Sequence, residues 1–511
     1  TYKPLFPRGE KRGMSLLYGS FLKCSPDKQE KRLSTSGSTE PVGERKTDTP
    51  PNPKRWLLLW TLATVQFIIF LDATIVNVAL PSIGRDLQMS SNQLTWVVNG
   101  YLLAAGSLLL LGGRIGDIVG RRKTFVVGAL MFGVASMVAV ASTSGSILLV
   151  GRVLQGVGEA LAAPAALGII ALTFTDPKEL QKAYGIWGGL SGLGAVAGVL
   201  LGGVITEFIS WRWIFGINIP LAIIPALMIF VLVDESKMRG KTSDGPLSAL
   251  LLAGGTVSLV YGILQVPVLG ISAASTWVPL SAGLILLFFF FALQARSSTP
   301  LLPLSFLGDR VRGSGYLGLG LLNAATSGMF FLVAIYMQNI LGYSPLQNGL
   351  AWIPYCVFFL AGIQLTISQM PKQGAKIMMI TGLFIAALGM AFLAARPFGI
   401  GFWEGLLPGL ILVGMGGGMT FPAAQTTAMD GLSMQDAGLG SGVTTTIGQI
   451  GQVVGLAVLT SIALGTDQGS ELVASGVGKA MFVSAVILSI AAVTVGFTLR
   501  GNRADVGKVP A

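Results

Sequence analysis

The sequence predicts an all-α polytopic membrane protein with fourteen transmembrane helices, arranged as two six-helix bundles with two inserted helices between them. Of the 511 residues, 52% are hydrophobic and only 11% are charged, whereas soluble domains carry about 25% charged residues. Fourteen apolar runs have about the length that crosses a bilayer. Sixty-nine glycines favour close helix packing in lipid, where small residues let backbones approach each other.

The fourteen segments begin at Trp56 and are separated mostly by short polar links. A longer link, Arg296 to Arg312, contains prolines and separates the eighth segment from the ninth. The segments cover approximately residues 56–80, 94–113, 124–142, 146–174, 182–206, 211–233, 247–268, 276–295, 314–340, 346–369, 376–395, 403–427, 437–463 and 478–499.

Composition divides the chain into five parts. Residues 1–55 are rich in Lys, Glu, Ser, Pro and Thr and have no apolar period, which predicts a disordered cytoplasmic tail. Since the chain starts at Thr1, Met14 is a candidate native start, and residues 1–13 would then be a translated leader. The remaining parts are an N-terminal six-helix bundle at 56–233, a linker with two extra transmembrane helices at 234–312, a C-terminal six-helix bundle at 313–499 and a cytoplasmic tail at 500–511.

The net charge of +11 reports the orientation of the chain in the membrane. Twelve Lys and Arg residues precede Trp56, and a further seventeen lie in alternate loops and the C-terminal tail, whereas the opposite loops hold four. Basic residues concentrate on the cytoplasmic side of membrane proteins. Both termini are therefore expected in the cytoplasm, and a nucleic-acid partner is not expected.

The residues that most enzymes and metal sites need are scarce. The chain has no histidine, which removes histidine metal sites and histidine proton relays, and its two cysteines, Cys24 and Cys356, cannot build a disulfide framework. Lys241-Thr242 imitates the end of a nucleotide-binding loop, but Glu235 stands where that loop requires a glycine. We therefore expect no enzyme, no metal and no cofactor, and an ATP-driven pump is not supported.

An internal repeat relates the two halves of the chain. One constant offset of 258 joins Gly156 to Gly414, Gly158 to Gly416 and Pro164 to Pro422. A second, of 254, joins Gly120 to Gly374, Arg122 to Lys376, Asp176 to Asp430, Ala183 to Ala437, Gly188 to Gly442 and Gly194 to Gly448. The mates lie six spans apart in the same direction once the inserted helices are set aside. Two related bundles with a site between them are the plan of an alternating-access transporter.

Three charged residues lie inside spans. Asp72 is in the first segment, at a depth where an acid costs roughly 2.5–3.5 kcal/mol on insertion scales, so it is a candidate functional group. Arg152 lies in the fourth segment at comparable depth, roughly 9 Å against roughly 13 Å from the same face, so the two can pair. Glu159 lies two turns beyond Arg152 on the same face. The alternative for each is a purely structural hydrogen bond between helices.

Two further patterns are candidates for conformational change. Gly113, Asp117, Gly120, Arg121 and Arg122 form a charged turn after the second segment, which we interpret as a cytoplasmic latch, although a role in orientation alone also explains it. The fifth segment carries a glycine stripe that lets another helix pack closely, and packing alone explains this spacing. The stripe includes Gly185, Gly194, Gly198, Gly202 and Gly203.

Polar residues also lie inside the spans, at Asn77, Asn99, Gln155, Asn218, Asn323, Gln425, Gln449 and Gln452. Each such residue is more often an interhelical hydrogen bond than a ligand contact. Asn77, Gln155, Asn218 and Asn323 are the candidates for a polar cavity wall.

Together these motifs resemble the major facilitator superfamily, and within it the fourteen-helix drug:proton antiporters, over residues 56–500. Leu71 to Pro81 is similar to that group's helix-1 signature, and the turn from Gly113 to Arg122 is similar to the superfamily's helix 2–3 motif. Arg152, Gln155, Gly156 and Gly158 match the helix-4 motif, whose arginine the resemblance implicates in proton coupling. The helix-5 glycines fall at the spacings of the antiporter motif, but Val199 stands where that motif has a proline. Glu159 also departs from the family, which has a small residue there.

The resemblance implies a proton-coupled exporter of amphipathic, mainly cationic compounds in the plasma membrane, with the major facilitator fold. Its expected partners are the lipid bilayer, a small amphipathic substrate and protons, and its expected assembly is a monomer. Two alternatives stay open. Val199 leaves room for an importer or facilitator of a small metabolite, and the tail leaves room for a membrane sensor or scaffold that transports nothing. The identity of the substrate does not follow from the sequence.

Overall fold

The computed structural model describes residues 54–499, except residue 175, residues 236–244, residues 271, 299 and 303, and residues 396–400, 433–436 and 465–473. The expected tail 1–55, apart from its last two residues, lies outside the described residues, as do Met14, part of the link at 236–244 and the tail 500–511. All regular elements in the described part of the chain are helices.

The helices follow the expected segments. Those of the N-terminal half are α1 (Arg55–Leu87), α2 (Ser91–Val119), α3 (Arg121–Val140), α4 (Gly145–Thr173), α5 (Pro177–Phe208), α6 (Trp213–Gly216) and α7 (Asn218–Leu232). Next come α8 (Gly245–Leu269), α9 (Ala274–Arg296) and α10 (Leu304–Gly308). Those of the C-terminal half are α11 (Arg310–Asn339), α12 (Pro345–Ala351), α13 (Ile353–Gln373), α14 (Ala375–Ala395), α15 (Phe402–Gly405), α16 (Leu407–Ala428), α17 (Ala437–Leu464) and α18 (Ala474–Thr498).

Thirteen stretches of the described residues are long and apolar enough to cross a membrane. The 32-residue helix α5 supplies the fourteenth expected segment. The fold class predicted from the sequence is therefore confirmed. The limits at residues 233 and 312 that the composition sets for the two halves stay predictions.

Three segments that the sequence presents as single helices are broken. Ile217 separates α6 from α7, Trp352 separates α12 from α13, and Leu406 separates α15 from α16. The first two breaks lie inside stretches, Trp213–Leu232 and Pro345–Gln373, that hydropathy alone reads as continuous. The first break makes Asn218 the first residue of α7, which matters for the site below.

Helix α1 is longer than the sequence predicts. We expected its end before Pro81, yet it continues to Leu87, and Gln88 closes it in a left-handed conformation with φ of 51°. Proline removes one backbone hydrogen bond from a helix. The turn beyond Pro81 still packs, because Ile83 is fully buried, and this contact explains why the helix does not stop there.

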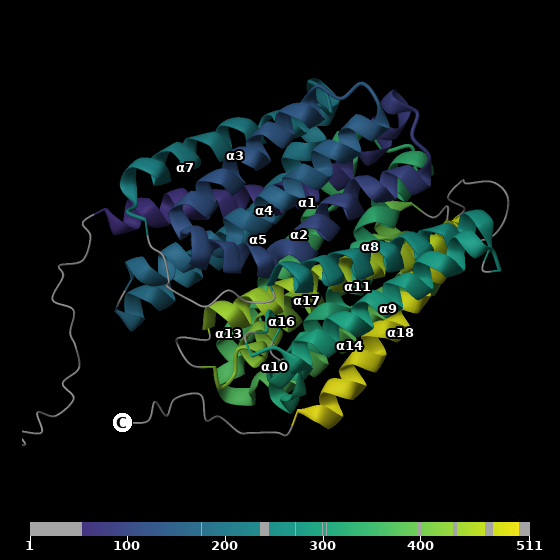
Figure 1. Ribbon diagram of the computed structural model, residues 1–511. Coiled ribbons are helices and arrows are strands. Elements are labelled where there is room, and N and C mark those ends of the chain that lie inside the picture. The colour runs from purple at the N-terminus through teal and green to yellow at the C-terminus, as the bar shows by residue number, and fades with distance from the viewer. Residues whose placement is uncertain are drawn as a thin grey trace, which may run out of the picture. The chain divides into compact units, whose positions relative to one another are not determined.

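Each half is a bundle held together by helices far apart in sequence (Figure 1). In the first half, α1 packs against α5, α2 against α4, and α3 against α4 and α7. In the second half, α11 packs against α17, and α14 against α16 and α18. The inserted helices α8 and α9 pack on each other, and α8 also contacts α2 and α17.

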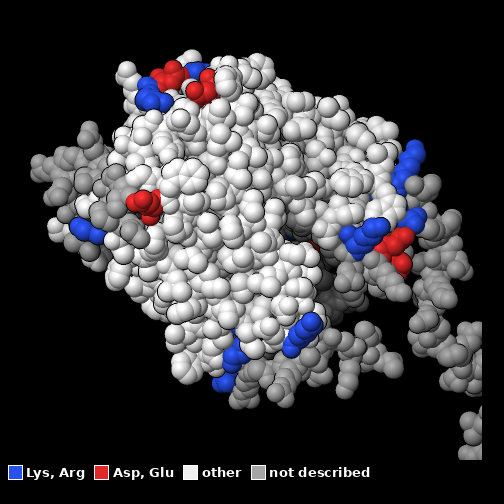
Figure 2. Space-filling view, turned by 180° about the vertical axis from the view of Figure 1, so that it is seen from behind, with Lys and Arg blue, Asp and Glu red and all other residues white. Residues whose placement is uncertain are grey.

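The two halves meet along a seam. We call the end of the bundles that holds Arg121 and Arg310 the basic end. At the other end, the Gln338 amide of α11 donates a 2.7 Å hydrogen bond to the Val78 carbonyl of α1, and Gly203 of α5 lies against Pro345 of α12. These contacts across α1–α11 and α5–α12 thus lie away from the basic end. Figure 2 shows charged side chains at the edges of one face and an uncharged surface between them, as a lipid-facing band requires.

Candidate functional site

Asp72 is the centre of a buried polar network. The Arg152 guanidinium lies 2.5 Å from Oδ2 of Asp72, and neither side chain is more than 1% exposed. The Asn218 amide donates to Oδ1 at 2.7 Å, and the Gln155 amide donates to the same oxygen at 3.4 Å. The pair that depth predicts between the first and fourth segments is therefore present in the structure.

Arg152 has its own set of partners. Its Nε donates to the Val97 carbonyl at 3.0 Å, and one terminal nitrogen donates to Oε1 of Gln155 at 2.8 Å. The guanidinium carbon lies 4.3 Å from the centre of the Tyr101 ring and 5.7 Å from that of Phe215. A cation over an aromatic face is stabilised by the ring quadrupole. The arginine is thus fixed from α2 and α6 as well as by Asp72.

Four long helices bring these groups together. Asp72 comes from α1, Arg152 and Gln155 from α4, Asn218 from α7, and Gln155 also donates to Ser136 of α3 at 2.9 Å. A buried ion pair is tolerated only when further hydrogen bonds satisfy both ions. Asp72 and Arg152 each have such further partners, so neither buried charge depends on the ion pair alone.

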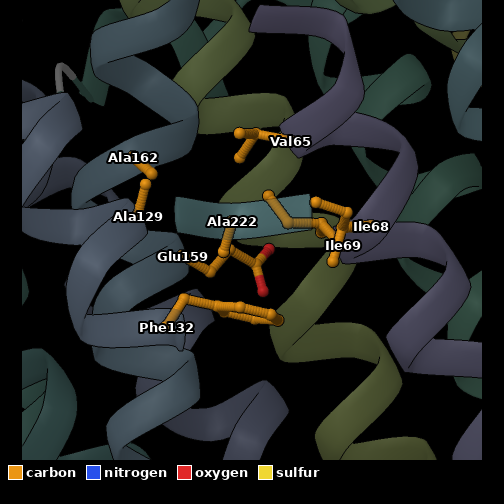
Figure 3. A pocket seen from close by; sticks show the side chains of 8 residues that line it. All are labelled: Val65, Ile68, Ile69, Ala129, Phe132, Glu159, Ala162 and Ala222. Atoms are coloured by element: carbon orange, nitrogen blue, oxygen red, sulfur yellow. The ribbon is translucent and has the colours of Figure 1, made fainter. Parts of the chain in front are cut away.

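Glu159 has a different environment, although it is only 3% exposed. Its Oε1 accepts a 2.8 Å hydrogen bond from the Gln449 amide of α17, in the other half, while Oε2 has no hydrogen-bond partner. The carboxylate borders a small cavity whose other lining residues are Val65, Ile68, Ile69, Ala129, Phe132, Ala162 and Ala222. Figure 3 shows it pointing between Phe132 and Ile69. Among the described residues no Lys or Arg forms an ion pair with it.

Of the four polar candidates, the structure brings two into the network. Gln155 and Asn218 contact Asp72 directly. Asn77 instead donates to the Ala73 carbonyl of its own helix at 3.0 Å, and Asn323 lies beside Gly448 within the second half. The sequence does not distinguish the residues that contact Asp72 from those that do not. It gives the depth of each side chain in the membrane but not its direction around the helix.

The turn at the basic end is a charged junction. Arg121 pairs with Asp117 at 3.0 Å and donates to the Gly168 carbonyl of α4 at 2.8 Å. Gly120 has φ of 124°, a conformation that favours glycine, and it begins α3 without a side-chain cap of its own. Gly113 lies against Pro164 of α4. Four of the five residues of the predicted latch therefore tie α2, α3 and α4 together, whereas Arg122 donates to the Val233 carbonyl after α7.

Glu235 completes this junction, and the sequence did not identify it. Its two oxygens accept from the backbone N–H groups of Arg122 and Lys123, both at 3.2 Å, and it lies 3.8 Å from Nε of Arg122. A carboxylate at a helix N-terminus satisfies free N–H groups and the helix dipole. In the sequence, Glu235 follows α7 in a polar link, and no spacing rule joins it to α3.

The glycines of α5 pack against two different helices. Gly194, Gly198 and Gly202 face the backbone of α1 from Phe67 to Ile75, on both sides of Asp72 in sequence. Gly203 faces α12 in the other half, whereas nothing lies within 4 Å of the Cβ position of Gly185. Val199, at the position of the motif proline, is buried, and α5 continues through it.

The described residues contain no group of three or more His, Cys, Asp or Glu side chains that could hold a metal ion. What the arrangement offers instead is two buried carboxylates in contrasting states. Asp72 has a cationic partner and two amide donors, and Glu159 has one amide donor and one unpaired oxygen.

Comparisons with known proteins agree with this architecture. The chain is 37% identical over 425 residues to the puromycin resistance protein pur8 of Streptomyces alboniger, covering 81% of this chain and 83% of that protein. It is 33% identical over 438 residues to the cephamycin export protein CmcT of Amycolatopsis lactamdurans, covering 84% and 90%. The crystal structure of the POT family transporter PepTSo superposes with a TM-score of 0.64 at 16% identity, covering 88% and 98%, which shows the fold alone. The model of the Major Facilitator Superfamily matches residues 62–456, and the chain belongs to this superfamily.

Proposed function

We propose that this chain is a proton-coupled exporter of amphipathic, mainly cationic drugs or toxic metabolites, which works by alternating access. The chain is a multi-pass protein of the plasma membrane and belongs to a family of transporters, not enzymes. The names of its relatives, a puromycin resistance protein and a cephamycin export protein, favour the outward direction. No enzymatic activity, metal or cofactor belongs to this proposal, in which the proton gradient supplies the energy to a monomer.

The observation that carries the proposal is the buried pair of Asp72 and Arg152. Ionisable groups inside a membrane protein typically mark the path of an ion. A proton that reaches Asp72 removes the attraction between α1 and α4 and leaves Arg152 held by Gln155, Val97 and the ring of Tyr101. Proton binding thereby changes the relative stability of two arrangements of the same bundle, which is what coupling requires.

The cargo would meet the second acid. Glu159 borders a cavity and offers a negative charge to a cation. Since one carboxylate oxygen cannot hold a proton and a cation equally well at once, protons from outside would displace the substrate and release it. This competition makes export depend on the proton gradient.

Contacts near the two ends of the seam would alternate during transport. In the described conformation the hydrogen bond from Gln338 to Val78 and the packing of Gly203 on Pro345 close the end opposite the basic one. Opening toward that side must break them. The Asp117–Arg121 pair with Glu235 lies at the basic end within the first half, where it joins the termini of α2 and α3 to α4 and to the link after α7. It would act as the latch by holding these helix ends in one arrangement.

The test is transport in proteoliposomes that contain the purified full chain and an imposed pH gradient, with puromycin as the first probe. An antiporter should accumulate puromycin in vesicles whose interior is more acidic than the medium, and an uncoupler should abolish this. Accumulation only with an acidic medium would support the importer instead. Absence of gradient-driven flux for any antibiotic in a susceptibility-guided panel would contradict transport and favour the sensor or scaffold.

A further inference from the structure

Glu159 and Gln449 lie at the seam between the two halves and are separate from the ion pair of Asp72 and Arg152. We propose that Glu159 is the subsite for the protonated amine head of a substrate, positioned by Gln449 from the other half, and that an ammonium group and a proton replace one another on its unpaired oxygen. This inference rests on the proposed function and specifies the head group that the exporter selects.

The first step is the uncompensated charge of Glu159. A carboxylate that is buried without a cationic partner is costly, so it must hold a proton or acquire a cation. Asp72 already has Arg152 within 2.5 Å, but the described part of the chain supplies no such partner to Glu159. The free oxygen Oε2 is therefore the place where a proton and a cationic ligand compete.

The surroundings of Glu159 add little charge. The ionisable side chains that act on it are Tyr101 on α2, whose hydroxyl is close enough to act as a hydrogen-bond donor, and Asp72 on α1 and Arg152 on α4 itself, which act electrostatically. Asp72 and Arg152 neutralise each other as an ion pair. The facing residues from α3 and α7, Ala129, Phe132 and Ala222, are apolar, and α17 contributes the neutral amide of Gln449. A ligand in this cavity would therefore interact mainly with the charge of Glu159.

The shape of the cavity selects the kind of cation. Its volume is about 10 Å³, close to the minimum that one water-sized group needs. An ammonium group is of that size and carries N–H donors, so it can satisfy Oε2 with a charge-assisted hydrogen bond. A trimethylammonium group is larger and has no N–H. The wall includes the Phe132 ring beside the carboxylate (Figure 3), and an aromatic ring face attracts a cation.

Gln449 is the positioning residue. Its amide holds Oε1 of Glu159 at 2.8 Å, which leaves Oε2 as the acceptor for a ligand. An amide side chain has an NH2 group that donates and a carbonyl oxygen that accepts. It can therefore donate to the ionised carboxylate or, after the amide rotates, accept from the O–H of the protonated carboxyl group. The Gln449 side chain lies close to α2, since a Cβ at Gly106 would come within 2.9 Å of the Cβ of Gln449. When an ammonium group and a proton replace one another on Glu159, the hydrogen bond from Gln449 to Glu159 is affected. This hydrogen bond joins the two halves.

The test is equilibrium binding by titration calorimetry to the purified full chain in detergent, with three probes that share one apolar body. These are 4-phenylbutylamine, its N,N,N-trimethyl counterpart and the neutral 4-phenylbutanol. Wild type should bind the amine roughly tenfold or more tightly than the trimethyl compound. Acidification should weaken amine binding. The number of protons released per bound amine should rise toward one, because more Glu159 is then protonated before binding, whereas binding of the alcohol should not depend on pH.

Variants distinguish a loss of the amine subsite from a general folding defect, because a folded variant should still bind the alcohol. Glu159→Gln should abolish the preference for the amine and its pH dependence and leave alcohol binding unchanged, while Glu207→Gln, at an exposed acid near the end of α5, should retain both. Gln449→Leu should shift the pH profile of amine binding without changing alcohol binding. Equal binding of the amine and the trimethyl compound by wild type overturns the proposal, and so does an unchanged preference in Glu159→Gln. Loss of gradient-driven flux with the amine preference intact would count against the exporter and not against this subsite.

Discussion

Asn218 and Asp72 are 146 positions apart in the chain, yet the Asn218 amide donates a 2.7 Å hydrogen bond to the Asp72 carboxylate. The contact depends on the break at Ile217, which starts α7 at Asn218. Arg152 approaches the same carboxylate from α4. The acid of the first helix is therefore held by two other helices of its own half, and its protonation alters contacts in both.

Removing Arg152 alone should destabilise the protein more than removing both charges. Arg152→Leu leaves the buried Asp72 carboxylate without its counter-ion, for which a cost of about 3–5 kcal/mol is typical. Asp72→Asn together with Arg152→Leu should recover most of this loss, because no buried charge remains. The measurement is thermal unfolding of the purified variants in detergent. A double variant no more stable than Arg152→Leu would argue against the pair as the source of the effect.

Asn218→Leu should lower both gradient-driven transport and the stability of the protein. The variant removes the shortest amide hydrogen bond to the Asp72 carboxylate, and a hydrogen bond to a charged group contributes about 1.5–3 kcal/mol. Asn323→Leu, which changes an asparagine outside the network, is the matched control. Flux into proteoliposomes and thermal unfolding measure the effect in both variants. An equal loss in both variants would contradict the assignment.

Glu235→Ala should weaken the junction at the basic end. The variant leaves the N–H groups of Arg122 and Lys123 without their acceptor, a loss of about 0.5–2 kcal/mol for a helix cap. Asp234→Ala removes a neighbouring exposed acid and serves as the control. Turnover in proteoliposomes and thermal unfolding should both fall in the first variant only. A similar decrease in both variants would show that the general charge of the link, and not this cap, matters.

The glycines of α5 give a steric prediction. A Cβ at Gly198 would overlap the Leu71 carbonyl and Thr74 of α1, so Gly198→Val should separate α5 from the helix that carries Asp72. Gly185→Val should be tolerated, because nothing lies within 4 Å of its Cβ position. The yield of monodisperse protein in size-exclusion chromatography measures both. Equal yields of the two variants would contradict the close packing of α5 on α1.

The sequence predicted the helices and the main charge pair because both follow from simple geometry. Hydropathy locates spans, and a rise of 1.5 Å per residue places Asp72 and Arg152 at similar depth. The same rules do not give the direction of a side chain around its helix, so Asn77 and Asn218 were equal candidates, although only Asn218 reaches Asp72. The contacts of Glu235 with α3 and of Gln449 with Glu159 join residues 112 or more positions apart. Such contacts depend on how the helices pack, which no local pattern encodes.

The account as a whole depends on Asp72, and gradient-driven transport tests it most directly. Wild type, Asp72→Asn and Asp86→Asn should be reconstituted at equal density, with puromycin outside and an acidic vesicle interior. Asp86, on the same helix, pairs with Arg212 at the partly exposed end of α1 and provides the matched control. We predict that Asp72→Asn abolishes gradient-driven accumulation while Asp86→Asn retains it. Accumulation by Asp72→Asn at the wild-type rate would contradict the central claim.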